Sequence, residues 1–264
     1  MVPAGRPALM IGPAAARGKR CARLVGPASS SRDTDSGRCA VDVAELVERL
    51  RGLDVSALCD ADKDLPVVDP GVRAMVPDVR MAGPALTVVA EDDHLPVLSA
   101  LGEAAPGDVL VIATNGGRVA VFGELFATEA RRRGLAGMVV DGFCRDLQGL
   151  RHVGLPVFAR GTIPMSGSTV SRSSLGVPVR CGGVEVTRGD VVFGDDDGVV
   201  IATPERVAAA LEAAEHIARA ERAILAGMAR GEALHDLTNH TEHVARLDRG
   251  EESALAFEVE LDVR

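Results

Sequence analysis

The sequence predicts an α/β protein in which helices pack on a sheet that contains parallel strands. Strand-like residues 84–90 and 109–113 enclose a helical segment at 95–104, which makes a strand-helix-strand unit. A second unit, helix followed by strand, lies at residues 123–140. The 264 residues are 47% hydrophobic but include no Trp, no Tyr and six Phe. The core must therefore be built from Ala, Val and Leu, which suits close packing of helices on a sheet.

The helix of the second unit has signals at both ends. Gly123 and Glu124 open it, and the unpaired N–H groups and positive dipole at a helix start favour a carboxylate there. Residues 131–133 are all Arg and close the helix, where positive charge is favoured. Gly134 is placed to adopt the left-handed conformation just past the end.

The following strand leads to a charged pair. Residues 136–140 are apolar and bounded by glycines, as expected of a strand buried on both faces. The strand is expected to end at a turn formed by Asp141 and Gly142, with Arg145 and Asp146 directly after it. Ligands of open α/β sheets bind beyond the carboxyl ends of strands. Arg145 and Asp146 are therefore expected at a ligand-binding edge.

Arg145 and Asp146 have two interpretations from residue types. In one they form a surface ion pair, or Asp146 is the N-cap of a helix over residues 147–154. In the other, Arg145 grips a substrate carboxylate through two hydrogen bonds and Asp146 binds a hard divalent cation such as Mg²⁺. Composition does not decide between them.

The spacing of Glu124, residues 125–144, Arg145 and Asp146 resembles the signature of the RraA-like family. This family contains 4-hydroxy-4-methyl-2-oxoglutarate/4-carboxy-4-hydroxy-2-oxoadipate aldolases and the regulator of ribonuclease activity A. Six segments are similar, in order: MAGPALTV at 81–88, PGDVLVI at 106–112, GEL at 123–125, GMVVDG at 137–142, GLPVFARG at 154–161 and GDVVFGDDDGVVIA at 189–202. The resemblance covers about residues 42–232, and one departure is Arg188, where family members commonly have Pro.

The resemblance implies a fold and an activity. The fold is a single compact β/α domain of the swivelling phosphohistidine-domain type with a long C-terminal helix. The chain is expected to assemble as a homotrimer or homohexamer with active sites between subunits. The implied activity is that of a class II aldolase, which uses Mg²⁺ or Mn²⁺ to cleave a small 4-hydroxy-2-oxo acid to pyruvate. Oxaloacetate decarboxylation is expected as a side activity, because it passes through the same enolate.

The resemblance also implies the catalytic and metal-binding residues. Asp146 would hold the metal, and Arg145 would hold the substrate and stabilise the enolate. Glu124 would orient a metal-bound water that moves protons. Glu221, on a helix predicted from Thr203 to about residue 230, would come from a neighbouring subunit.

Gly123 and its neighbours form the expected substrate-binding segment. The backbone N–H groups of Leu125 and Phe126, at the start of the central helix, would bind the substrate carboxylate. His94, at the end of strand 84–90, is either a ligand-side residue or an ordinary loop histidine.

A competing interpretation is a non-catalytic regulator that binds a ribonuclease or an RNA helicase. Such a binding module does not require Glu124, Arg145 and Asp146 together. A third, a demethylmenaquinone methyltransferase, is a name attached to some similar sequences. The chain has no Gly-rich S-adenosylmethionine loop after a first strand, which argues against it.

Composition limits partners and compartment. A net charge of −9 and a pI of about 5.2 disfavour non-specific binding to nucleic acid. No apolar run approaches the roughly 20 residues that span a bilayer, so no membrane partner is expected. The five cysteines include no C-x-x-C pair, which indicates reduced thiols in the cytoplasm. Cys144 is either an inert small apolar residue or, beside Arg145, a thiol of lowered pKa.

Three regions follow from these patterns. Residues 1–40 are expected to be a disordered extension, because residues 1–32 carry six bases and no acid. Residues 41–232 form the predicted catalytic domain. Residues 233–264 form a C-terminal extension whose two histidines, at 240 and 243, have helical metal-like spacing but no third ligand nearby.

Two polar segments are predicted to be connections. Residues 161–176 are rich in Ser, Thr, Gly and Pro but lack a G-x-S-x-G or Walker pattern, so a loop over the site is expected. Residues 195–198 read DDDG between two strands, which favours a hairpin turn over a metal-binding cluster.

Overall fold

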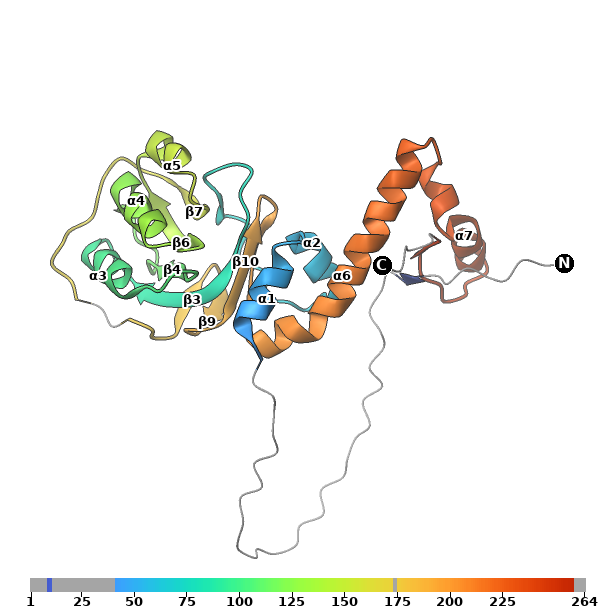
Figure 1. Cartoon of the computed structure of the whole chain (residues 1–264), viewed down its shortest axis with the longest axis horizontal. Coiled ribbons are helices and arrows are strands. Elements are labelled where there is room, and N and C mark those ends of the chain that lie inside the picture. The colour runs from blue at the N-terminus through green and yellow to red at the C-terminus, as the bar shows by residue number, and fades with distance from the viewer. Residues whose placement is uncertain (1–8, 11–40, 173–174, 259–264) are drawn as a thin grey trace, which may run out of the picture.

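A mixed sheet forms the centre of the molecule in the computed structural model, which describes residues 9–10, 41–172 and 175–258 (Figure 1). Its strands are β2 (Arg73–Ala74), β3 (Met81–Val89), β4 (Val109–Ala113), β5 (Ala120–Phe122), β6 (Gly137–Cys144), β7 (Val157–Thr162), β10 (Val191–Asp195) and β11 (Gly198–Ala202). The spatial order is β11-β10-β3-β4-β6-β7-β2, and β5 pairs with β6 beside this path. The inner pairs β3·β4, β4·β6 and β6·β7 are parallel, as predicted.

Two groups of helices pack on different parts of the sheet (Figure 1). The bounds of the helical elements are α1 (Val43–Leu50), α2 (Val55–Ala61), α3 (Leu95–Glu103), α4 (Glu124–Arg132), α5 (Leu147–Val153), α6 (Pro204–Ala229), the 3₁₀ turn η1 (Leu234–Leu237) and α7 (His240–Asp248). Helices α3, α4 and α5 share a core with β4, β6 and β7, whereas α1, α2 and α6 share a separate core with β10 and β11. The surroundings of α4 and of α6 are therefore separate cores at different parts of the sheet.

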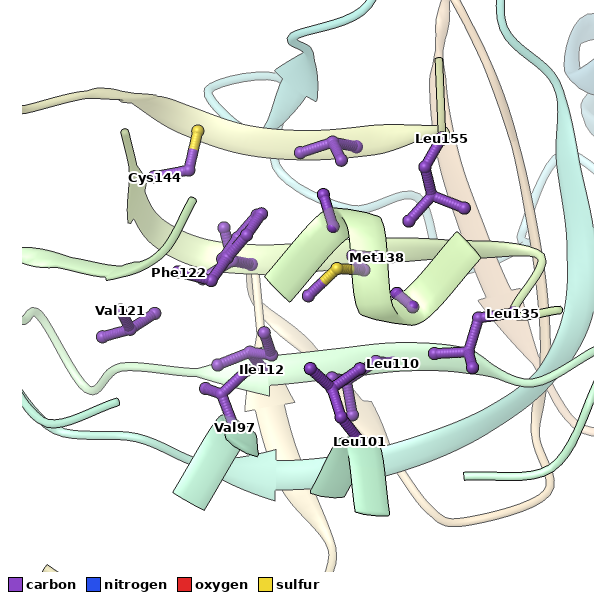
Figure 2. Close-up of a cluster of buried hydrophobic side chains, with 14 of the residues drawn as sticks. Val97, Leu101, Leu110, Ile112, Val121, Phe122, Leu135, Met138, Cys144 and Leu155 are labelled. Carbon is purple, nitrogen blue, oxygen red and sulfur yellow. The ribbon is translucent and has the colours of Figure 1, made fainter. Parts of the chain in front are cut away.

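Strand β4 illustrates why the sheet is buried on both faces. Leu110 and Ile112 point to the helices and meet side chains of α3, as Figure 2 shows. Val109 and Val111 point to the opposite face, which a hairpin of β8 (Val179–Cys181) and β9 (Val184–Val186) covers. Successive side chains of a strand alternate in direction, so a strand covered on both faces is apolar throughout.

The sheet curls towards closure. The segment before β2 reaches the free edge of β11, where Val67 forms a bridge with Val200 and the N–H of Val68 donates to Val199 O at 2.8 Å. The result is a mixed α/β fold with a nearly closed, barrel-like sheet.

The predicted end signals of α4 are confirmed, and α1 also has a side-chain N-cap. Asp42 accepts hydrogen bonds from the N–H groups of Ala44 and Glu45 at the start of α1. Helix α4 begins at Glu124 and ends at Arg132, and Gly134 has a φ of +80°. These signals involve neighbours in sequence, which is why they could be read without the fold.

The predicted end of the central strand was wrong. Strand β6 continues through Asp141 and Gly142 to Cys144, with a register shift against β7 instead of a turn. A Cβ at Gly142 would overlap or crowd the Thr114 side chain, so the glycine permits close approach of two strands. Asp141 pairs with Arg160 and accepts from the N–H of Gly182 at 2.7 Å, which keeps this polar residue within the sheet.

The acidic run after β10 is a hairpin turn, as predicted. Asp195 is paired with Gly198 at the end of the antiparallel β10·β11 ladder. Asp195 also accepts from the N–H of Val55 at 2.8 Å, so its carboxylate supports the start of α2.

The terminal regions are described only in part. The predicted disorder of residues 1–40 falls outside the described residues, except that β1 (Leu9–Met10) pairs with β12 (Ala256–Phe257). In the C-terminal extension, α7 has no buried residue, and His243 Nδ1 lies 2.9 Å from Ser253 Oγ. Among residues 9–10, 41–172 and 175–258, no helix combines the length and apolar character needed to cross a bilayer.

Candidate active site

A pocket of about 140 Å³ lies where β5 and β6 end and α4 begins. Five residues predicted for the site line it: Gly123, Leu125, Phe126, Arg145 and Asp146. His94, Ser166 and the residues of β5 complete the lining. The fold therefore brings together the two charged residues and the helix start that the sequence places far apart along the chain.

Asp146 does not cap the helix that follows it. It occupies the N-cap position of α5 but has a φ of +59°, and its side chain makes no capping hydrogen bond. Its Oδ2 instead lies 3.4 Å from the N–H nitrogen of Glu124 and 3.4 Å from Nε of Arg145. The N-cap interpretation is therefore wrong, whereas the ion pair exists and faces the start of α4.

Arg145 has a fixed backbone and an available side chain. Its N–H donates to Phe122 O at 3.1 Å, which ties the end of β6 to β5. The side chains of Arg145 and Asp146 are 40% and 43% exposed, so neither is sealed by protein. Within the described parts of the chain, the Arg145 side chain has no ion-pair partner besides Asp146. The geometry leaves both charges open to a ligand in the pocket.

The start of α4 offers one backbone donor. In the described residues no hydrogen bond occupies the N–H of Leu125, whereas the N–H of Phe126 donates to Gly123 O at 3.1 Å. The expectation that both N–H groups are free therefore holds only for Leu125. Phe126 contributes its ring instead, which packs edge to face on His94 with centroids 5.8 Å apart.

Two glycines allow the charged groups to lie close to backbone. A Cβ at Gly123 would overlap Oδ2 of Asp146 and lie 2.9 Å from Cγ of Arg145. A Cβ at Gly149, within α5, would overlap the carboxyl group of Glu124. Glu124 therefore reaches across to α5 and does not line the pocket itself. Sequence analysis missed Gly149, although a glycine inside a short helix is a signal of close packing.

His94 lines the pocket, as the ligand-side alternative for this residue requires. It stands at the start of α3, on the wall shared with Ser166. Ser166 comes from the segment predicted to be a loop over the site, and the backbone of Ala120 pairs with this segment. No sequence signal singled out Ser166.

Asp93, next to His94, is buried and ionised. Burial opposes its charge, but hydrogen bonds from the Ser168 hydroxyl and from the N–H groups of Ser171, Val170 and Leu95 outweigh this effect. The pKa of Asp93 therefore lies well below its usual range. Sequence analysis missed this residue, because three of the four partners of its carboxylate lie 75 to 78 positions away.

The ionised Asp93 should make stability depend on pH. A carboxyl whose pKa is lowered on folding stabilises the protein above its unfolded pKa of about 3.9, and this contribution is lost as pH falls towards the folded value. We expect Asp93→Asn to lower Tm by about 5 °C or more at neutral pH, with a gap from the wild type that narrows below about pH 4. Thermal unfolding measured from about pH 7 to pH 3 tests this. A difference in Tm between the variant and the wild type that stays constant over this pH range would contradict the expectation.

Glu221 lies away from the pocket of its own chain. It is half-buried on α6, and burial together with the nearby charges of Asp60 and Asp54 raises its pKa. These partners belong to α2 and the residue that precedes it, in the helix group that packs on β10 and β11 and lies apart from α4 (Figure 1). Glu221 is not among the residues that line the pocket of its own chain.

Cys144 is not an activated thiol. It is fully buried at the end of β6, and burial raises its pKa to about 12. The hypothesis of a lowered pKa beside Arg145 is wrong, because the side chain of Cys144 points into the core that Figure 2 shows.

Comparisons with known proteins identify relatives of this chain. A "Putative 4-hydroxy-4-methyl-2-oxoglutarate aldolase" of Halalkalibacterium halodurans is 35% identical over 159 residues, which cover 60% of this chain and 76% of that protein. An uncharacterised protein of Methanocaldococcus jannaschii is 30% identical over 202 residues, covering 75% of this chain and 95% of the relative. The crystal structure of an unusual member of the RNase ES inhibitor RraA protein family from Streptomyces coelicolor matches with a TM-score of 0.60 and 30% identity, covering 67% of this chain and 95% of that one.

A family model described as RraA-like, Aldolase/RraA, matches residues 55–201. This range contains the whole pocket, from His94 to Ser166. With the sequence spacing, the fold and the relatives in agreement, the chain belongs to the RraA-like family.

Proposed function

We propose that this protein is a divalent-metal-dependent aldolase that cleaves a 4-hydroxy-2-oxo acid to pyruvate and also decarboxylates oxaloacetate. One observation carries the proposal: Arg145, Asp146 and the N–H of Leu125 converge on one pocket. An aldolase needs positive charge at one end of its substrate. Arg145 and the N–H of Leu125 would provide it directly, and Asp146 would anchor a cation.

The reaction explains the need for positive charge. Removal of the proton from the C4 hydroxyl lets the C3–C4 bond break, so that C4 leaves as a carbonyl. The bonding electrons pass to C3 and are delocalised as pyruvate enolate, which takes up a proton at C3 to give pyruvate. Arg145 and the N–H of Leu125 bind the carboxylate of this fragment, and Arg145 adds charge where the enolate forms.

The donor set around Asp146 fits Mg²⁺ or Mn²⁺. Mg²⁺ is usually held by one or two carboxylates and keeps several waters. Asp146 is a single, partly exposed carboxylate beside an open pocket, and among the described residues no group of three or more His, Cys, Asp or Glu could form a closed cage. When bound, such an ion acts as a Lewis acid towards the 2-oxo group and the developing enolate.

Glu124 is the nearest candidate for proton transfer. It adjoins two lining residues, Gly123 and Leu125, and its own N–H faces Asp146, while its side chain lies against Gly149. From there Glu124 can accept the C4 hydroxyl proton, and later return a proton to C3, through a water. Glu221 of a neighbouring subunit would supplement it, in a homotrimer or homohexamer of swivelling phosphohistidine-type domains.

A regulator of RNA processing is the second candidate. The Streptomyces coelicolor relative is described as belonging to an RNase inhibitor family, and it covers 67% of this chain. Such a function would use the protein surface and would not depend on Arg145 or Asp146. Binding to a ribonuclease or RNA helicase that survives Arg145→Ala, in a chain without aldolase activity, would favour this alternative.

Metal removal is the direct test of the enzyme. We expect EDTA to abolish pyruvate release from 4-hydroxy-2-oxo acids and from oxaloacetate, and Mg²⁺ or Mn²⁺ to restore it, because the enolate then regains its electron sink. Pyruvate formation coupled to lactate dehydrogenase measures this. Spontaneous oxaloacetate decay without protein is the control. Enzyme-dependent release at the full rate in EDTA would refute the metal-dependent mechanism.

A further inference from the structure

We propose that Asp93 is a positioning residue whose buried carboxylate fixes the part of the pocket lining that His94 and Ser166 form. Asp93 does not itself line the pocket, but His94, the next residue, does. Ser166 also lines the pocket, and it lies in the segment of residues 163–171, which donates hydrogen bonds to Asp93. The kinetic part of this inference rests on the proposed aldolase function, and its structural part does not.

One carboxylate joins two parts of the chain. Oδ2 of Asp93 accepts hydrogen bonds from Ser168 Oγ at 2.5 Å, from Val170 N at 2.8 Å and from Ser171 N at 2.9 Å. Oδ1 accepts from the N–H of Leu95 at 2.8 Å, at the start of α3. The side chain is only 1% exposed, so water cannot replace these donors.

Backbone pairing continues the same contact. The N–H of His94 donates to Ser168 O at 3.0 Å, and the N–H of Ser168 donates to Asp92 O at 2.9 Å. A Cβ at Gly167 would overlap the carbonyl of Asp92, so the segment lies directly on residues 92–93. His94 and Ser166 are thereby held at a constant separation on one wall.

Apolar burial does not hold this segment in place. Two of its large hydrophobic side chains, Met165 and Val170, are 65% and 81% exposed. A segment without core packing depends on its polar contacts for order. The Asp93 carboxylate supplies three of these contacts, and charge strengthens each of them.

The chemistry requires an ionised acid at residue 93. Three donors converge on one oxygen atom and a fourth binds the other oxygen. An asparagine has one accepting oxygen, and its NH₂ group would face donors on the other side. Asp93→Asn therefore keeps the size of the side chain but releases either α3 or the segment around Ser168.

The test separates substrate binding from turnover. In full-length Asp93→Asn, we expect KM for oxaloacetate with Mg²⁺ to rise about tenfold or more while kcat changes by less than about threefold, because misplaced binding groups weaken capture of the substrate. We also expect amide hydrogen exchange in residues 163–171 to become about tenfold faster or more. Ser168→Ala should shift both quantities less, and should add little to Asp93→Asn.

Asp108→Asn is the matched control. Asp108 also accepts a backbone hydrogen bond, from Ala105 N at 2.9 Å, but precedes β4 at the end of the sheet away from the pocket. We expect wild-type KM from this variant. The proposal fails if Asp93→Asn leaves both KM and exchange in residues 163–171 unchanged, or if Asp108→Asn raises KM equally. If the wild type forms no pyruvate, the aldolase function fails, and hydrogen exchange still decides whether Asp93 orders the segment.

Discussion

Asp146→Asn is expected to reduce metal-dependent pyruvate release by about a thousandfold or more, because the only carboxylate in the pocket that can anchor the cation is lost. The fold should survive. Asp146 has a φ of +59°, and Asn is among the few residues other than Gly that adopt this conformation readily. Pyruvate formation across a range of Mg²⁺ and Mn²⁺ concentrations, with Tm measured in parallel, gives the result.

Asp197→Asn is the control for that substitution. Asp197 is an exposed acid in the hairpin turn between β10 and β11, so the variant removes one negative charge at a distance from the pocket. It should retain wild-type activity. Full activity of a folded Asp146→Asn variant would mean that the cation, if one is used, is held elsewhere.

Gly149→Ala is expected to reduce kcat by about a hundredfold although the substituted residue touches no substrate. The new Cβ would overlap the carboxyl group of Glu124 and push it away from its place beside the pocket. Because Ala is favoured over Gly in a helix by about 1 kcal/mol, α5 itself should not be weakened. We therefore expect kcat to fall without a fall in Tm. Measuring both quantities on the same variant tests this.

The origin of that loss can be assigned with two further variants. Gly102→Ala also replaces a helical glycine, near the end of α3, where a Cβ meets nothing within 4 Å, and it should leave kcat unchanged. In a Glu124→Ala background, Gly149→Ala should cost little more, since the displaced group is already absent. Additive losses in the double variant would show that Gly149 acts through something other than Glu124.

Much of the fold follows from local patterns. The limits of α4 and the hairpin at residues 195–198 were each predicted from residues within a few positions of one another. Caps, dipole charges and turn preferences act over this short range, so they can be predicted from the sequence alone.

Other features depend on partners that are distant along the chain. Strand β6 passes through a turn-like Asp141 because Arg160 and the N–H of Gly182 hold that carboxylate. Asp93 is ionised while buried because a segment 75 or more positions later donates to it. Nothing near either residue in the sequence predicts these donors.

The amino-acid sequence alone was sufficient to identify the family, the α/β class and the residue types of the candidate site, because spacing, capping and strand composition are local properties. Folding in three dimensions established the rest: Asp146 turns towards α4 instead of capping α5, and Glu124 reaches over Gly149. It also put His94 and Ser166 into the lining of one pocket, to which Glu221 does not contribute. These outcomes depend on which surfaces pack together and which buried polar groups find partners, and both are settled only when the whole chain is compact.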